Sequence, residues 1–117
     1  MIKKRGICEL GTHVICSLYG IPFEKLNNLS AIREAFDLAV DKMQATVLHK
    51  FSHQFIPQGV TIVYALKESH ISCHSFPEMG SVALDCYTCG KMDAKVGMEV
   101  LIEFFDPIEV SMQEISR

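Results

Sequence analysis

Histidines at a regular spacing are the first residues in this sequence that could do chemistry. His49 and His53, and again His70 and His74, are four positions apart, so both rings of a pair lie on one side of a helix or a strand. Imidazoles in this arrangement can bind zinc when further imidazoles or thiolates complete the ligand set. Without such ligands, the expected state is two pairs of partly exposed histidines on strand faces.

Cysteines supply the other candidate ligands. The chain has five of them, at positions 8, 16, 73, 86 and 89, and Cys86 and Cys89 form a Cys-x-x-Cys pair. Structural zinc sites usually carry two such paired elements, so the sequence predicts no metal. A redox role is disfavoured as well, since no helix is expected directly after Cys86 to activate it. The odd number of cysteines favours free thiols, one of them reactive, in a cytoplasmic protein.

Polar side chains are densest between Lys67 and Gly90. The segment contains Ser69, His70, Ser72, His74, Glu78, Asp85 and Cys89. From composition alone, it is two polar strands around a turn, and the ordinary interpretation is the solvated face of a sheet.

The elements that must position these groups follow from the apolar pattern. Short β-branched or alternating runs that end at turn residues predict strands, and apolar residues at every third or fourth position predict helices. The expected strands are 11–19, 45–55, 60–67, 70–76, 81–88 and 107–115. One amphipathic helix is expected from Phe23 to Met43, with irregular first turns, and a second begins after Asp93 as its N-cap. The apolar stripe of the second helix would consist of Val96, Val100, Leu101 and Phe104.

The order of elements, β-α-β-β-β-β-α-β, predicts an α+β fold. Few helices and short connections between strands are typical of a two-layer sandwich, an antiparallel sheet with two helices packed on one face. In the strand 81–88, Val82, Leu84 and Cys86 would share one face, and Asp85 and Tyr87 the other. With 117 residues, the chain is expected to form one domain.

Composition excludes several classes of protein. Hydrophobic residues at 49% and charged residues at 21% are typical of a globular domain and not of a disordered, collagen-like or coiled-coil chain. The formal net charge of -3 argues against nucleic acid as the main partner, because phosphate binding needs a basic surface. No apolar run is long enough to span a membrane, and the basic start lacks the apolar stretch and cleavage site of a signal peptide. We therefore expect a cytoplasmic protein without a membrane partner.

A longer pattern connects the polar segment with its neighbours. It consists of Pro57-Gln58-Gly59-Val60, Glu68-Ser69-His70, His74, Pro77-Glu78 and Asp85-Cys86-Tyr87-Thr88-Cys89-Gly90, preceded by Leu10-Gly11-Thr12-His13 and Leu18-Tyr19-Gly20. This pattern closely resembles that of the short prokaryotic, pyruvoyl-dependent S-adenosylmethionine decarboxylase proenzymes, and the resemblance covers nearly the whole chain.

The resemblance implies that the protein makes its own cofactor. The Ser69 hydroxyl would attack the carbonyl of Glu68, and cleavage between them would leave residues 1–68 as a beta chain and 69–117 as an alpha chain that begins with a pyruvoyl group. That group would form a Schiff base with the substrate amine and act as an electron sink while carbon dioxide leaves. His74 matches the base of the processing reaction, and Thr61 stands where the family usually has a serine that donates a hydroxyl.

The resemblance also assigns the substrate site. Cys89 matches the proton donor of the family, Phe55 and Phe76 match two rings that stack on adenine, and Glu78 matches the carboxylate that binds the ribose hydroxyls. In an unrelated protein, such phenylalanines would more often be core residues and such a cysteine a small buried side chain. The joint spacing of these residues outweighs those interpretations.

A symmetric homodimer with active sites at or near the interface is implied as well. Ser69 and His74 are five positions apart and would lie on opposite faces of one flat strand, so His74, with Thr61, could act on Ser69 of the partner subunit. The expected product is decarboxylated S-adenosylmethionine, the aminopropyl donor for spermidine synthesis.

Two alternatives remain open from the sequence. Ser17 and the run Met79-Gly80-Ser81 depart from the usual family pattern, which would suit a remade pocket in a pyruvoyl-dependent decarboxylase of ornithine or arginine. A non-catalytic paralogue that activates a true enzyme would be expected to lack Ser69, His74 or Cys89, and all three are present.

Overall fold

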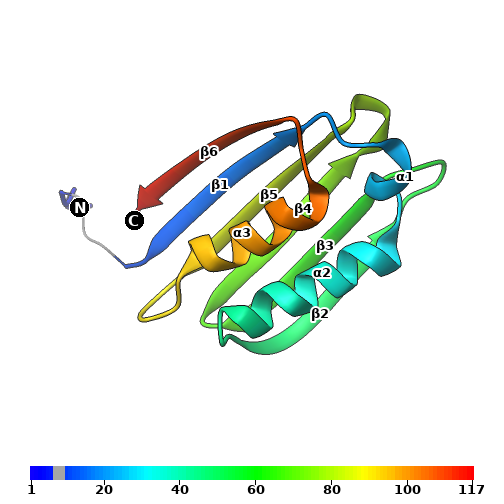
Figure 1. The fold of residues 1–117 in the computed structure, drawn as a ribbon. Coiled ribbons are helices and arrows are strands. Elements are labelled where there is room, and N and C mark those ends of the chain that lie inside the picture. The colour runs from blue at the N-terminus through cyan, green and yellow to red at the C-terminus, as the bar shows by residue number, and fades with distance from the viewer. Residues whose placement is uncertain (7–9) are drawn as a thin grey trace.

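Six strands of alternating apolar and polar residues form one sheet in the computed structural model, which describes residues 1–6 and 10–117. The strands are β1 (Thr12–Tyr19), β2 (Thr46–Gln54), β3 (Val60–Lys67), β4 (Ser69–Phe76), β5 (Ser81–Thr88) and β6 (Glu109–Ser116). They pair antiparallel in the order β2-β3-β4-β5-β1-β6, so β1 lies between the late strands β5 and β6 (Figure 1). This arrangement brings the two polar strands, β4 and β5, to the middle of the sheet.

Helices cover one face of this sheet, which confirms the predicted two-layer α+β sandwich (Figure 1). They are α1 (Phe23–Leu26), α2 (Leu29–Lys42) and α3 (Ala94–Phe105), and the turn η1 (Pro77–Met79) is a 3-10 helix. None of the described helices is long and apolar enough to cross a lipid bilayer.

The segment predicted as one helix from Phe23 to Met43 with irregular first turns forms two helices, which Asn27 and Asn28 separate. Asn28 caps α2, because its side chain accepts a hydrogen bond from Ala31 N at 3.0 Å. Asn27 is the C-cap of α1, with its backbone N–H donating to Phe23 O, and its side-chain Oδ1 accepts a hydrogen bond from Gly59 N at 3.0 Å. Phe23 is consequently 45% exposed and not part of the core.

Asp93 caps α3 as predicted, and its side chain accepts a hydrogen bond from Lys95 N at 2.9 Å. In the predicted apolar stripe of this helix, Leu101 is fully buried, and Val96, Val100 and Phe104 are partly buried and pack against the core. The buried face consists of Ala94, Gly97, Met98, Leu101 and Phe105, whereas Val96, Val100 and Phe104 are partly exposed. A Cβ at Gly97 would collide with the Met43 side chain, so the lack of a side chain there lets this face of α3 lie against the end of α2.

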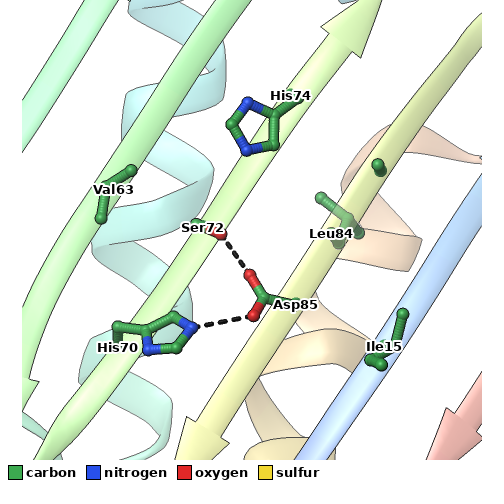
Figure 2. Close-up of a pocket in the computed structure, with 8 residues that line it drawn as sticks. Ile15, Val63, His70, Ser72, His74, Leu84 and Asp85 are labelled. Atoms are coloured by element: carbon green, nitrogen blue, oxygen red, sulfur yellow. Dashed lines mark hydrogen bonds and ion pairs between the residues drawn. The ribbon is translucent and has the colours of Figure 1, made fainter.

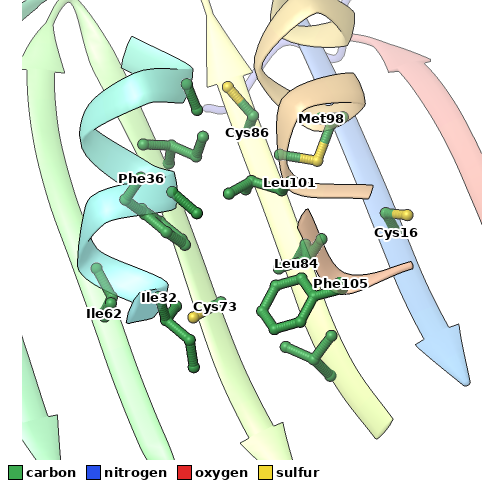
Figure 3. Packing of buried hydrophobic residues seen from close by; sticks show 14 of the residues in the cluster. Cys16, Ile32, Phe36, Ile62, Cys73, Leu84, Cys86, Met98, Leu101 and Phe105 are labelled. Carbon is green, nitrogen blue, oxygen red and sulfur yellow. The ribbon is translucent and has the colours of Figure 1, made fainter. Parts of the chain in front are cut away.

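The core fills the space between the sheet and the two long helices (Figure 3). Phe36 of α2 and Leu101 and Phe105 of α3 are fully buried in one cluster with Ile62 and Leu84 of the strands. Burial of each such side chain contributes about 1.5–3 kcal/mol. Among the described side chains, no buried nitrogen or oxygen lacks a hydrogen-bond partner. The stability of the fold therefore resides on this side of the sheet.

Candidate active site

The sheet face opposite α2 and α3, here called the open face, carries the polar side chains of β4 and β5 (Figure 2). Ile71 and Cys73 of β4 are buried on the helix side, so the alternating positions His70, Ser72 and His74 lie on the open face. A shallow cavity of about 630 Å³ lies there and is lined in part by these three residues and Asp85. The predicted spacing of His70 and His74 on one strand face fits this arrangement.

One group of candidate residues lies where β4 begins. Leu66 pairs with Ser69 across the β3–β4 hairpin, which leaves Lys67 and Glu68 as a two-residue loop. Ser69 Oγ lies 3.5 Å from Cys89 Sγ, at the end of the neighbouring strand β5. We call Glu68, Ser69 and Cys89 the cleavage end of the site.

The backbone at Ser69 adopts a conformation that residues with a side chain rarely adopt. Its φ is 122°, a region that is essentially restricted to glycine and costs other residues about 1–3 kcal/mol. Such strain persists only where the surrounding structure enforces it. Here β3 and β5 pair with β4 on both sides at Ser69. The strained residue is the one that the sequence predicts as the site of cleavage.

Cys89 differs from the other described cysteines, all of which are free thiols. Cys16, Cys73 and Cys86 are buried, and burial raises their pKa values to about 11, about 12 and about 12. Cys89 is partly exposed. The pKa of Tyr87 is raised by partial desolvation and by its hydrogen bond with Cys89. Cys89 is therefore the thiol best placed to react, while Cys8 lies outside the described residues.

A second group of candidate residues lies at the other end of β4. His74 Nδ1 is 3.1 Å from Thr61 Oγ1 on the adjacent strand β3. Both side chains lie on the open face, and His74 is exposed. The structure thus brings together the two residues that the sequence predicts as base and hydroxyl donor.

The predicted substrate-binding residues surround this second group. Phe55 and Phe76 are 46% and 42% exposed, unlike core aromatic residues. Glu78 is exposed on η1, and its Oε2 accepts a hydrogen bond from Gln58 Nε2 at 3.3 Å. Gln58 belongs to the loop that follows Phe55, so loop and turn are neighbours. We call these residues the pocket end of the site: Phe55, Thr61, His74, Phe76 and Glu78.

The two ends are separated along β4. Strands rise about 3.3 Å per residue, so the five steps from Ser69 to His74 span roughly 17 Å. In addition, Ser69 pairs with Leu66 and Thr88, which are buried on the helix side, whereas His74 pairs with Thr61. Within one chain, the structure does not bring His74 to Ser69.

A hydrogen-bonded cluster around Asp85 was not predicted from the sequence. Its Oδ2 accepts hydrogen bonds from His13 Nε2 at 2.7 Å and His70 Nε2 at 2.8 Å, and its Oδ1 accepts one from Ser72 (Figure 2). Burial raises the pKa of Asp85, but these three hydrogen bonds outweigh that effect and hold it below the usual value. Alternation alone marked Asp85 and His70 as open-face residues. Their convergence with His13 depends on β1 pairing with β5, which the sequence did not reveal.

The ligand types in this cluster, two histidines and one carboxylate, are those of a metal site. However, Arg117 lies 3.2 Å from His13 Nδ1, and arginine can only donate, so His13 Nδ1 is the acceptor and Nε2 carries the proton. A metal ligand needs the lone pair of that Nε2. The cluster as it stands is a hydrogen-bond network.

The residues of the zinc site considered from the sequence do not converge. Cys86 is buried beneath the helices, and Cys89 lies beside Ser69 at the cleavage end. His49 and His53 lie on β2, at one edge of the sheet.

Comparison with known proteins provides an independent line of evidence. The family model described as S-adenosylmethionine decarboxylase matches residues 12–117. The chain is 36% identical to the S-adenosylmethionine decarboxylase proenzyme of Brevibacillus brevis over 108 residues. This region is 92% of this chain and 81% of that protein. It is 42% identical over 94 residues to the proenzyme of the same name from Bacillus velezensis, which covers 80% of this chain and 75% of that protein.

Solved structures show the same likeness. The crystal structure of the adenosylmethionine decarboxylase from Aquifex aeolicus matches with a TM-score of 0.88 and 35% sequence identity over 93% of this chain and 91% of that chain. The Trypanosoma brucei AdoMetDC-delta26 monomer matches with a TM-score of 0.61 and 20% identity over 86% of this chain and 44% of that chain. At that identity, the second likeness shows the fold alone.

Proposed function

The chain belongs to the S-adenosylmethionine decarboxylase family, and we propose that it removes the carboxyl group of S-adenosylmethionine with a pyruvoyl group made from its own Ser69. The product would be the aminopropyl donor for spermidine synthesis. The free thiols of the described cysteines fit the cytoplasmic location expected from the sequence.

Processing begins with the Ser69 hydroxyl. Its Oγ bonds to the carbonyl carbon of Glu68 while the peptide C–N bond breaks and the hydroxyl proton passes to the amine of residue 69, so the peptide becomes an ester. A base then removes the Cα proton of residue 69, the bond between its Cβ and the ester oxygen breaks, and Glu68 leaves as the carboxylate end of chain 1–68. Water hydrolyses the remaining dehydroalanine to a pyruvoyl group and ammonia. The second chain comprises residues 69–117.

The conformation of Ser69 is the observation that carries this proposal. A φ of 122° raises the energy of the intact peptide, mainly through its Cβ. Conversion of Cα to a planar, unsaturated carbon relieves that strain, so the fold favours the product over the uncut hairpin. The residue under strain also has a hydroxyl, which the first step requires.

Turnover requires a proton donor next to residue 69. When formed, a pyruvoyl group supplies a carbonyl that bonds the substrate amine and accepts electrons as carbon dioxide leaves. The proton donor would be Cys89, whose Sγ lies 3.5 Å from Ser69 Oγ, and it would protonate the substrate carbon that loses the carboxyl group. Proton transfer of this kind is typically worth about 10²–10⁴ in rate.

The substrate assignment rests on the pocket end. Exposed Phe55 and Phe76 can stack on adenine and face a cationic sulfonium, and the Glu78 carboxylate can accept hydrogen bonds from the ribose hydroxyls. Ornithine and arginine have neither an adenine to stack between the two rings nor ribose hydroxyls for Glu78 to bind, although their cations can contact a ring face. Carbon dioxide release should therefore be measured with carboxyl-labelled S-adenosylmethionine, ornithine and arginine in parallel. Release from S-adenosylmethionine alone supports the proposal, and release from a basic amino acid alone would assign the chain to the alternative decarboxylase.

We further propose that the active site forms between two copies of the chain. The cleavage end and the pocket end lie roughly 17 Å apart on one strand, and the chemistry needs both at one place. Two open faces packed against each other, with a two-fold axis running across the strands near Ser72, would place the cleavage end of each copy against the pocket end of the other. Exposed apolar residues on the open face, such as Ile15 at 42% exposure, suit such packing.

Mixed dimers test this arrangement directly. Ser69→Ala and His74→Ala chains, distinguished by tags, should each remain uncut when expressed alone. Expressed together, they should form dimers with one complete site, and the His74→Ala chain should then be cleaved. If the His74→Ala chain stays uncut in the mixed dimer, Ser69 and His74 must act within one chain, and the shared site is excluded.

A further inference from the structure

In the uncut chain Ser69 directly follows the β3–β4 loop, and cleavage would make it the first residue of a new chain. Chain ends fray unless side chains or neighbouring strands hold them. The two-residue loop of Lys67 and Glu68, which fixes the start of β4 in the uncut hairpin, is lost at the moment the cofactor forms. Strand pairing with β3 and β5, together with side-chain contacts, must then hold residue 69 in place through each turnover.

We propose that Asp85 is the clamp that positions the new chain end after cleavage, a role that rests on the proposed self-processing. One carboxylate holds two of the first four residues of the new chain: Oδ2 binds His70, the residue directly after Ser69, and Oδ1 binds Ser72. Asp85 lies on β5, which belongs to the same new chain but is paired on both sides, with β4 and β1. The clamp therefore ties a free end to the interior of the sheet.

His13 makes the clamp rigid. It binds the same oxygen as His70, at 2.7 Å from Asp85 Oδ2, and it comes from β1, on the other side of β5. Its own ring is fixed by Arg117 at Nδ1. Hydrogen bonds to a charged group are stronger than neutral ones, and this carboxylate accepts three of them. The Asp85 side chain consequently has little freedom, and neither does the His70 ring that it holds.

Asp85 is thus a positioning residue and not a catalytic one. The contacts that define it join Asp85 to His13, His70 and Ser72, and none of them reaches the pocket end. A positioning role predicts a specific pattern: loss of Asp85 should disturb the start of β4 in the cleaved protein far more than in the uncut protein, where the loop still holds it.

Amide hydrogen exchange of the segment 69–76 measures this difference. In Asp85→Asn, an NH₂ group replaces one acceptor oxygen, so the amide cannot satisfy all three donors. In the cleaved protein, this substitution should speed exchange of the segment by about tenfold or more, and kcat should fall about as much with KM little changed. In the uncut Ser69→Ala background, the same substitution should change exchange only slightly.

Asp37→Asn is the matched control. Asp37 also accepts two side-chain hydrogen bonds, from Tyr64 at 2.7 Å and Lys50 at 2.9 Å, but it lies on α2, away from Ser69. The Asp37→Asn substitution should leave amide hydrogen exchange of residues 69–76 and kcat unchanged. Ser72→Ala, a milder change that removes one donor, should reproduce part of the Asp85→Asn effect if the latter protein folds poorly.

The outcomes separate the clamp from the proposed function. A wild-type chain that neither cleaves nor releases carbon dioxide would refute the proposed function. A wild-type chain that does both, together with equal exchange effects of Asp85→Asn in the cleaved and uncut proteins, would overturn the clamp and leave Asp85 as an ordinary fold contact.

Discussion

Along β4, Ile71 and Cys73 are fully buried beneath the helices, whereas His70 and His74 lie on the open face. The same contrast holds on β5, where Leu84 and Cys86 are buried and Asp85 accepts hydrogen bonds on the other side. One face of the sheet buries apolar surface, and the other presents imidazole, carboxyl and hydroxyl groups. Since side chains alternate along a strand, stability and chemistry can change independently in neighbouring residues.

The largest difference between the faces should appear at two cysteines three positions apart. Cys89→Ala should still be cleaved, because no processing step needs a thiol, but turnover should fall by about 10²-fold or more. Cys86→Ala, on the buried face, should keep most of its activity. Carbon dioxide release and pyruvoyl content of both variants measure this. Equal activity in the two variants would remove Cys89 from the mechanism.

A core substitution should have the opposite effect. Phe105 is fully buried under the sheet, and Phe105→Ala should lower the free energy of unfolding by about 3–5 kcal/mol. The fraction that remains folded should cleave itself at the wild-type rate, because Phe105 does not touch the open face. Urea unfolding of uncut Ser69→Ala chains with and without this change gives the stability difference. A selective loss of cleavage in folded protein would contradict the separation of the faces.

Phe76→Ala should affect binding and not stability. Its ring is 42% exposed, so its removal should change the free energy of unfolding by less than about 1 kcal/mol, while a lost stacking ring should cost about 1 kcal/mol of substrate binding, or about fivefold in KM. Phe23→Ala is the matched control, because Phe23 is similarly exposed at 45% but lies on α1. If both variants change KM equally, the adenine site lies elsewhere.

The smallest expected effect is on how much stability the protein loses at low pH. Burial raises the pKa of Asp85, but hydrogen bonds from Ser72, His13 and His70 outweigh it and lower the pKa. A lowered pKa in the folded state contributes stability that is present above the unfolded pKa of about 3.9 and is lost as pH falls through the folded value. Between pH 5 and pH 3, the uncut Ser69→Ala protein should therefore lose more unfolding free energy than the same protein that also carries Asp85→Asn. An equal loss would show that Asp85 is not held in its ionised form.

Much of this site was predictable from the sequence because alternation and motif spacing are local properties. The faces of β4 and β5 and the cap at Asp93 follow from such patterns, whereas the roles of Ser69, His74 and Cys89 are predictions from the family resemblance. Irregular first turns were predicted for the first helix, but the exact break at Asn27 and Asn28 was not, since the side chain of Asn27 binds Gly59, a partner distant in sequence.

Other features depend on which strands pair. The Asp85 cluster needs β1 next to β5, an order that no local pattern encodes. The relation of Ser69 to His74 is different, since counting residues along one strand predicts that they lie on opposite faces, although their separation along the strand was not predicted. That a second copy of the chain brings the two ends of the site together remains a prediction.

The central claim is that Ser69 becomes the cofactor, and an intact mass spectrum of the purified protein tests it most directly. The account predicts two chains, residues 1–68 and 69–117, with the second blocked at its start by a group without an amine, and a single uncut chain for Ser69→Ala. A wild-type protein that stays at 13.1 kDa after long incubation, like Ser69→Ala, would contradict it.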